Sequence, residues 1–322
     1  MIEKGEVFYG KILLFGEYGV IFNSRALTIP YTHFKGELSF ASKYKYTDLE
    51  WAQASNQSLK KFADHLSILQ QQQALGCSMN IKQLHRDLDK GMYFESTIPQ
   101  GYGIGSSGAL VAAIYNRYAE EKIKSDRNLS KKSVFKLKDI FSKMEAFFHG
   151  KSSGLDPLNC YIQYPLFIED STEINTVAIP RNKFDKGGAI FLINSGAPGK
   201  TAPLVRYFLD SYATKPDFKQ MIDADFIPTN NESIQALLDG RGGDFFNLLN
   251  RLSQLQFNHF QRMIPESIRP IWEQGLLSGD FQMKLCGSGG GGFMLGFTQD
   301  YEKARVSLSS CGMEMIPVYK NV

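Results

Sequence analysis

The sequence contains few cysteines. Its 322 residues include four of them, which stand far apart and form no CxxC pair: Cys77, Cys160, Cys286 and Cys311. Scattered cysteines of this kind exclude a disulfide framework and a cysteine-based zinc site. Reduced thiols in a cytoplasmic protein are the expectation.

Long apolar runs and blocks of like charge are also missing. No apolar run reaches the roughly 18 residues that a membrane-spanning helix needs. The segment Met1–Gly10 carries Glu3, Lys4 and Glu6 and lacks the apolar core of a signal peptide. The net charge is only +3, from 36 basic and 33 acidic residues. We therefore expect neither nucleic acid nor a membrane as a partner.

What the sequence does contain is a mixture of helical and strand patterns. Hydrophobic residues make up 43% and charged residues 21%, as in ordinary globular proteins, and the length favours two domains. Apolar spacing predicts strands at Val7–Phe15, Gly36–Tyr44, Met92–Ile98, Ala189–Asn194, Gln282–Cys286 and Gly292–Phe297. It predicts helices at Ser58–Leu75, Ser106–Lys122, Val134–His149, Ser233–Leu238 and Phe245–Arg262. A polar stretch with a glycine pair interrupts the pattern at Arg181–Gly188, so we place the domains at 1–180 and 181–322.

A glycine-rich segment, Pro99–Gly108 (PQGYGIGSSG), follows a predicted strand and opens a predicted helix. Glycines let the backbone approach a bulky anion, and the first turn of a helix offers free N–H groups and a positive dipole end. The two serines add hydroxyls for phosphate or metal. A plain turn with Ser106 as helix N-cap is the alternative, and it leaves two glycines without a purpose. The segment therefore predicts a polyphosphate site.

Two other nucleotide-binding patterns fit less well. The spacing GxGxxG at Gly103, Gly105 and Gly108 occurs in dinucleotide-binding folds, but there the first glycine directly follows the strand. The segment Asn194–Thr201 ends in GKT like a P-loop, yet it has Asn194 where the P-loop needs glycine. Pro198 would also remove a backbone donor. Neither pattern therefore replaces the interpretation of Pro99–Gly108 as a polyphosphate site.

A second glycine-rich tract lies within Lys284–Phe297 (KLCGSGGGGFMLGF). A flexible hairpin turn is the simplest interpretation. However, ordering so many glycines costs more backbone entropy than a turn requires. The tract therefore indicates backbone packed closely against a ligand or another loop.

Taken in order, these segments resemble the GHMP kinases (galactokinase, homoserine kinase, mevalonate kinase and phosphomevalonate kinase). That family has a lysine-bearing N-terminal strand, the motif P-x-x-x-G-L-G-S-S-A and a C-terminal glycine-rich segment. The corresponding segments are Gly10–Val20, Pro99–Gly108 and Lys284–Gly292. The resemblance spans nearly the whole chain.

Within that family the segments resemble the mevalonate kinases most. Gly10–Val20 is similar to their GK-[apolar]₃-GEH motif, and Glu145 followed by the run His149–Asp156 is similar to their E…HG-x-PSG-[apolar]-D. Five positions depart from the motifs. Tyr18 stands in place of histidine, Ile104 in place of leucine, Ser288 in place of a small apolar residue, Gly108 in place of alanine and Ser152 in place of proline. The departure at Tyr18 bears on the substrate.

The resemblance implies a fold, a chemistry and a set of residues. The fold class is α+β, with an N-terminal ribosomal-protein-S5-like domain, a C-terminal ferredoxin-like α/β-plait domain and the site in the cleft between them. The implied co-substrate is ATP with Mg²⁺, a small alcohol is the acceptor, and the chain is a monomer or homodimer. The implied nucleotide-binding residues are Pro99, Gly101, Gly103, Gly105, Ser106, Ser107, Gly108, Gly287 and Gly289. The implied catalytic pair is Lys11 and Asp156, the metal ligands are Ser107 and Glu145, and the acceptor-binding residues are Glu17, Tyr18, Thr201 and Gly290.

Local physical arguments bear on four of these residues. Lys11 stands mid-strand among apolar residues, where an ammonium needs an acidic partner or a phosphate. Glu145 borders an apolar helix stripe, where either a metal or a lysine would supply the counter-charge. Asp156 precedes Pro157 and could also be a turn aspartate. His149 follows a helix and is read as structural.

The leading functional hypothesis is transfer of the ATP γ-phosphate to the 5-hydroxyl of mevalonate, in isoprenoid precursor synthesis. Tyr18 keeps open an acceptor such as phosphomevalonate, a sugar or another small alcohol. A non-catalytic nucleotide sensor is the third hypothesis. It predicts that Lys11, Glu145 or Asp156 is replaced by another residue, and all three are present.

Overall fold

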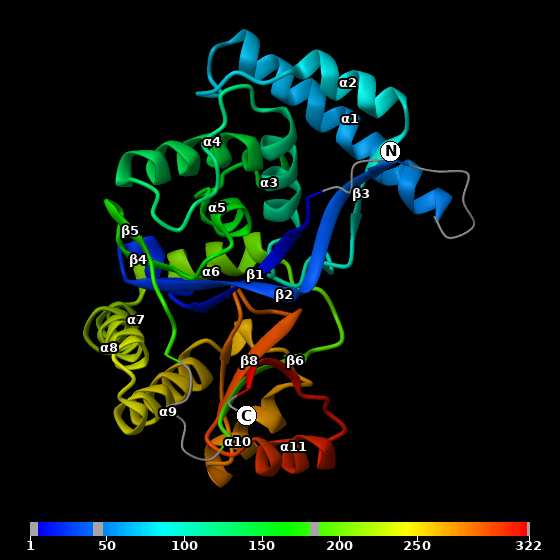
Figure 1. The fold of residues 1–322 in the computed structure, drawn as a ribbon. Coiled ribbons are helices and arrows are strands. Elements are labelled where there is room, and N and C mark those ends of the chain that lie inside the picture. Colours follow the sequence, from blue (N-terminus) through cyan, green and yellow to red (C-terminus); the bar gives the residue numbers. More distant parts are fainter. Residues whose placement is uncertain (1–5, 41–47, 181–186, 321–322) are drawn as a thin grey trace. The chain divides into compact units, whose positions relative to one another are not determined.

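The computed structural model describes residues 6–40, 48–180 and 187–320 (Figure 1). The chain divides into two compact units, each built from several segments. Unit 1 consists of Met1–Lys11, Ile29–Pro99 and Gly105–Tyr164, and unit 2 of Ile12–Thr28, Gln100–Ile104 and Pro165–Val322. Strands β1 (Phe8–Phe15) and β2 (Ala26–Phe40) contribute residues to both units. The domain boundary predicted at 180/181 falls beside residues 181–186, which lie outside the described residues.

Unit 1 is mainly helical. Besides its parts of β1 and β2, it contains α1 (Leu49–Gln71), α2 (Ile81–Asp89), β3 (Met92–Ser96), α3 (Ser106–Tyr118), α4 (Lys131–His149) and α5 (Leu155–Ile162). Strand β3 pairs antiparallel with the end of β2, with Gly36 opposite Ser96. Helices α3, α4 and α5 contact one another, and they meet at Tyr115, Phe141 and Tyr161. The three rings meet edge to face, with centroids 5.1–5.5 Å apart, a geometry that aromatic pairs prefer.

Side-chain caps and a short bridge set helix ends that periodicity alone misses. Helix α1 begins at Leu49, earlier than the predicted Ser58, because the Asp48 side chain accepts a hydrogen bond from the Trp51 amide. Helix α3 ends at Tyr118 rather than Lys122, because Ala119 is extended and forms a β-bridge with Met79.

Unit 2 contains β4, β5 and parts of β1 and β2 from a five-stranded sheet, and a second sheet of four strands. After η1 (Gly19–Phe22) come β4 (Leu166–Asp170), β5 (Glu173–Thr176), β6 (Ala189–Asn194), α6 (Thr201–Thr214), α7 (Pro216–Met221), η2 (Ile222–Phe226), α8 (Ile227–Leu238) and α9 (Gly242–His259). The chain continues through η3 (Gln261–Met263), α10 (Arg269–Ser278), β7 (Gln282–Leu285), β8 (Phe293–Thr298), α11 (Tyr301–Ser310) and β9 (Ile316–Lys320). The second sheet has the order β7-β8-β6-β9, and each neighbouring pair is antiparallel. The first residues of β2 pair antiparallel with β4, which pairs with β5.

Aromatic side chains fill the core of unit 2. Phe15, at the end of β1, lies 6.1 Å from Phe245 of α9 and 5.8 Å from Phe297 of β8, measured between ring centroids. A second cluster surrounds Phe260, which follows α9. Phe218 of α7 and Phe226 of the π-helical turn η2 both lie against it, at 6.2 and 4.9 Å.

Each predicted helix and strand corresponds to an observed element. The described residues form a mixed α+β structure with two sheets, so the predicted fold class is confirmed. Strand β6 has the predicted bounds, and the described part of Gly36–Tyr44 lies in β2, while residues 41–44 lie outside the described residues. The sequence patterns missed α2, α5, α6, α7, α10, α11, β4, β5 and β9. Among the described residues no helix is both long and apolar enough to cross a bilayer.

The turn between α4 and α5 yields a test of packing. Gly150 and Gly154 both have positive φ, 72° and 73°. A Cβ at Gly154 would lie 2.2 Å from the Lys138 carbonyl oxygen, whereas nothing lies within 4 Å of a Cβ at Gly150. Gly150→Ala should cost only the backbone strain, about 1 kcal/mol. Gly154→Ala should cost about 1–3 kcal/mol more because α4 and α5 must separate. Equal denaturation midpoints for the two variants would contradict this packing.

Candidate functional site

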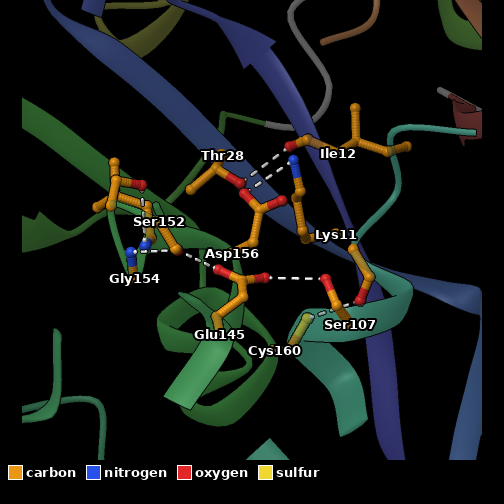
Figure 2. A network of polar contacts seen from close by, with 12 residues as sticks. Lys11, Ile12, Thr28, Ser107, Glu145, Ser152, Gly154, Asp156 and Cys160 are labelled. Carbon is orange, nitrogen blue, oxygen red and sulfur yellow. Dashed lines mark hydrogen bonds and ion pairs between the residues drawn. The ribbon is translucent and has the colours of Figure 1, made fainter. Parts of the chain in front are cut away.

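The N-terminus of α3 is open to an anion. The helix begins at Ser106, and its N-cap is Gly105, with φ 79° and no side-chain cap. The alternative in which Ser106 caps the helix is therefore wrong. The N–H groups of a first helical turn have no intrahelical partner, so an uncapped turn can bind a phosphate. Figure 2 shows the polar side chains around this turn in unit 1.

Glycines bring this turn close to Lys11 and to α5. A Cβ at Gly105 would lie 2.8 Å from the Lys11 Cγ, and one at Gly108 would lie 2.9 Å from the Asp156 carbonyl carbon. The Cys160 thiol on α5 donates a weak hydrogen bond to the Gly105 carbonyl oxygen at 3.8 Å. Both glycines are therefore required for the close approach, and Gly108 in place of the motif's alanine fits this contact.

Lys11 and Asp156 form an ion pair. The Lys11 Nζ lies 2.9 Å from the Asp156 Oδ1, with the lysine buried and the aspartate side chain 43% exposed. Lys11 is on β1, and Asp156 is in the first turn of α5, where the helix dipole favours a carboxylate. The predicted acidic partner of Lys11 is thus present, and the aspartate keeps a solvent-facing side.

Glu145 is a buried carboxylate on α4. The Ser107 hydroxyl donates to its Oε1 at 3.0 Å, and the Ser152 hydroxyl donates to its Oε2 (Figure 2). Burial raises the pKa of Glu145 to about 7, and the charge of Asp156 adds to this shift, while the two hydroxyls and Lys11 act against it. Hydroxyl groups, rather than a lysine, are its hydrogen-bond donors. A cation beside this carboxylate would offset the cost of its burial.

His149, the last residue of α4, also reaches this cluster. Its Nε2 lies 3.0 Å from the Ser107 Oγ. The Ser107 hydroxyl therefore contacts both the Glu145 carboxylate and the His149 ring. The interpretation of His149 as structural, drawn from the sequence, did not include this contact.

In unit 2, Glu17 forms a buried ion pair with Lys284. Its Oε1 lies 2.5 Å from the Lys284 Nζ, and the two side chains are 1% and 0% exposed. Lys284 also donates to the Leu285 carbonyl oxygen at 2.9 Å and lies over the Phe15 ring. Glu17 therefore joins the turn after β1 to β7. Contact of Glu17 with an acceptor stays a prediction.

Tyr18 is buried beside Glu17. Its ring stacks on Phe208 of α6 at 4.5 Å and meets Phe260 edge to face at 5.6 Å. Its hydroxyl donates to the Ser288 carbonyl oxygen at 2.6 Å. Direct contact of Tyr18 with an acceptor likewise stays a prediction.

The glycine tract at 287–292 packs closely against neighbouring backbone, as the sequence indicated. A Cβ at Gly289 would lie 2.4 Å from the Met263 carbonyl oxygen, and one at Gly103 would lie 3.2 Å from the Cys286 carbonyl oxygen. The Gly290 amide donates to Met263 at 2.6 Å. The Gly199 amide donates a hydrogen bond to the Gly101 carbonyl oxygen at 3.0 Å.

The predicted residues therefore gather in two sets, one in each unit. Unit 1 brings together Lys11, Gly105, Ser106, Ser107, Gly108, Glu145 and Asp156, with Pro99 at the end of its middle segment. Unit 2 contains Glu17, Tyr18, Gly101, Gly103, Thr201, Gly287, Gly289 and Gly290. Their individual roles stay predictions. Sequence reasoning missed Ser152, His149 and Lys284 as members of these networks.

Comparison with known proteins supports the predicted resemblance. Residues 66–163 match the family described as GHMP kinases N terminal domain. The chain is 24% identical over 288 residues to a mevalonate kinase of Archaeoglobus fulgidus, with 89% of each chain covered.

Solved structures agree in fold. The crystal structure of L. major mevalonate kinase in complex with R-mevalonate matches with a TM-score of 0.64 and 17% identity, covering 98% of this chain and 95% of that one. A Streptococcus pneumoniae phosphomevalonate kinase matches with a TM-score of 0.60 and 15% identity, covering 98% of both chains. Residues 66–163 therefore match the N-terminal domain of the GHMP kinases, and the fold of the chain is that of the solved mevalonate kinase and phosphomevalonate kinase structures.

Proposed function

We propose that this chain transfers the γ-phosphate of ATP to the 5-hydroxyl of mevalonate, a step of isoprenoid precursor synthesis. The observation that carries the proposal is the Lys11–Asp156 ion pair beside the uncapped N-terminus of α3 in unit 1. The similarity to the mevalonate kinase of Archaeoglobus fulgidus supports the choice of acceptor.

In the proposed reaction each residue of unit 1 has a separate task. The first-turn amides of α3 and the Ser106 hydroxyl bind phosphate oxygens. The exposed side of the Asp156 carboxylate orients the acceptor hydroxyl and accepts its proton. The Lys11 ammonium, fixed at 2.9 Å from that carboxylate, offsets negative charge on the phosphoryl group in transfer.

The same unit offers a place for Mg²⁺. The described residues contain no cluster of three or more His, Cys, Asp or Glu side chains that could hold a metal. Mg²⁺, however, commonly takes only one or two carboxylates and completes its shell with water and phosphate oxygens. Glu145 and Ser107 fit that requirement, because a buried carboxylate and a hydroxyl oxygen lie 3.0 Å apart. Bound there, Mg²⁺ would neutralise phosphate charge.

A second acceptor is favoured by one observation. The tyrosine that replaces the motif's histidine has its hydroxyl bound to Ser288, so this position does not offer an imidazole to the acceptor. Phosphomevalonate or a sugar is therefore the alternative, and the fold is shared with a phosphomevalonate kinase. A non-catalytic sensor is disfavoured because the Lys11–Asp156 pair is formed.

The acceptor is tested by turnover. With Mg-ATP and millimolar R-mevalonate, the purified chain should release ADP well above its rate without acceptor. A parallel panel contains phosphomevalonate, galactose and homoserine. Turnover with a panel member and none with mevalonate would overturn the acceptor assignment and leave the phosphotransferase assignment standing.

The proposed base is tested by Asp156→Asn. Losing a general base lowers the rate by about a hundredfold to ten-thousandfold, so kcat should fall in that range while the KM for ATP changes little. Asp139→Asn is the matched control, because Asp139 pairs with Lys143 on the surface of α4 at 2.6 Å. A near wild-type kcat for Asp156→Asn would refute the assigned role.

Glu145 predicts a pH dependence. Its pKa in the folded chain is raised to about 7, so the folded state holds this proton more tightly than the unfolded state does. In EDTA, stability should therefore fall as the pH rises from about 4.5 to about 7, by up to about 3 kcal/mol. Glu145→Gln should lack this fall, because the amide does not ionise.

The measurement is the melting temperature of both proteins between pH 5 and pH 8. Adding Mg²⁺ should stabilise the unmodified protein most above pH 7, where the carboxylate is ionised, and should leave Glu145→Gln largely unaffected. Parallel pH curves for the two proteins would contradict the raised pKa.

A further inference from the structure

The turn that follows β1 in unit 2 is hydrogen-bonded to a buried asparagine of helix α8. The Asn230 side chain on α8 accepts a hydrogen bond from the Gly16 amide at 3.0 Å and donates to the Arg25 carbonyl oxygen at 2.9 Å. It also donates to the Ser24 hydroxyl at 3.1 Å. Both ends of the turn are thereby hydrogen-bonded to one side chain.

Within this turn, Tyr18 has an unfavourable backbone. Its φ is 60° and its ψ is −43°, a region that non-glycine residues rarely occupy. Such strain persists only where surrounding contacts enforce it, and it is common at functional sites. Here the strained backbone directs the Tyr18 ring between Phe208 and Phe260 and brings its hydroxyl to Ser288.

Ser288 is the residue that needs such a contact. It is the only non-glycine residue in the segment 287–292 (GSGGGG), and its neighbours Gly287 and Gly289 both have positive φ. Glycines on either side give the Ser288 peptide many accessible orientations. The Tyr18 hydroxyl, whose pKa is raised by burial and which therefore stays protonated, donates to the Ser288 carbonyl oxygen and selects one of them.

The Ser288 side chain contacts the first residue of α6. Its hydroxyl donates to the Thr201 Oγ1 at 3.0 Å, and Thr201 is exposed. Because this bond uses the Ser288 proton, the Thr201 hydroxyl keeps its own proton for another acceptor. The two hydroxyls therefore present a neutral donor at a fixed point of unit 2.

We propose that Tyr18 is a positioning residue that acts through Ser288 and holds the Ser288–Thr201 hydroxyl pair against an oxygen-bearing group of the phosphoryl acceptor. This inference rests on the proposed function for the existence of an acceptor, and it replaces direct contact of Tyr18 with that molecule. Tyr18 and Ser288, two of the positions that depart from the mevalonate kinase motifs, touch each other. The substitutions at Tyr18 and Ser288 thus act together in binding the acceptor, and the hydroxyl donor that they position suits an uncharged or anionic oxygen.

The first test is Tyr18→Phe, which removes the hydroxyl and keeps the aromatic packing. Loss of one buried hydrogen bond corresponds to roughly a tenfold change in binding, so the KM for R-mevalonate should rise about tenfold while the KM for ATP stays within about twofold. Tyr212→Phe is the matched control, because the Tyr212 hydroxyl contacts Asp223 on the exposed surface of the same unit. An unchanged KM for R-mevalonate in Tyr18→Phe would overturn the proposal.

A double-mutant cycle separates positioning from direct contact. If Tyr18 acts through Ser288, Ser288→Ala should raise the same KM, and Tyr18→Phe combined with Ser288→Ala should raise it little further. Fully multiplicative effects would mean that the two residues act independently, and would overturn the coupling.

A third measurement needs no acceptor. The amides of Gly290 and Gly292 donate to the Met263 and Ala197 carbonyl oxygens, so hydrogen exchange at 287–292 reports the order of the tract. Tyr18→Phe should speed that exchange about tenfold, in line with one lost hydrogen bond, and Tyr212→Phe should not. Unchanged exchange would overturn the positioning role. Faster exchange without turnover of mevalonate would overturn only the proposed acceptor.

Discussion

The structure of unit 2 depends on an ion pair between two buried side chains, Lys284 and Glu17. Neither Lys284 nor Glu17 could be buried alone, because an isolated charge in an apolar interior is very costly, and removing one partner typically costs about 3–5 kcal/mol. Their contact ties the turn after β1 to the strand that leads into the glycine tract. Tyr18 follows Glu17, and Ser288 follows Lys284 closely, so the second contact between these segments depends on the first.

The ion pair of unit 1 has the same chemistry and a different exposure. Lys11 and Lys284 are both buried, but Asp156, the partner of Lys11, is 43% exposed, whereas Glu17 is 1% exposed. The Glu17 carboxylate is closed to solvent in this structure. A carboxylate with one side on its lysine and the other on solvent can meet a hydroxyl group. The difference in burial therefore separates the Glu17–Lys284 pair from the Lys11–Asp156 pair, to which we assign chemistry.

The sequence was most informative where one residue type is physically demanding. A lysine inside an apolar strand predicted the acidic partner of Lys11, and the same argument applied to Lys284 within QMKLC would have predicted its glutamate. The cost of ordering five glycines predicted close backbone packing, which the structure confirms. Ser152, Ser288 and Asn230 could not be found this way. Their roles depend on which distant segment each side chain meets, and a serine or asparagine is ordinary in any loop or helix.

The π-helical turn at Ile222–Phe226 constrains the number of residues in this part of the chain. In an α-helix residues seven apart share a face, whereas Phe218 and Phe226 are eight apart and both contact Phe260. The wider turn absorbs the additional residue. Inserting one residue there would rotate one of the two rings by about 100° away from Phe260, whereas deleting one would leave the rings seven apart on one face of a regular α-helix. Homologous chains can thus lose a residue of this turn more easily than they can gain one, because an insertion misaligns everything on one side of it.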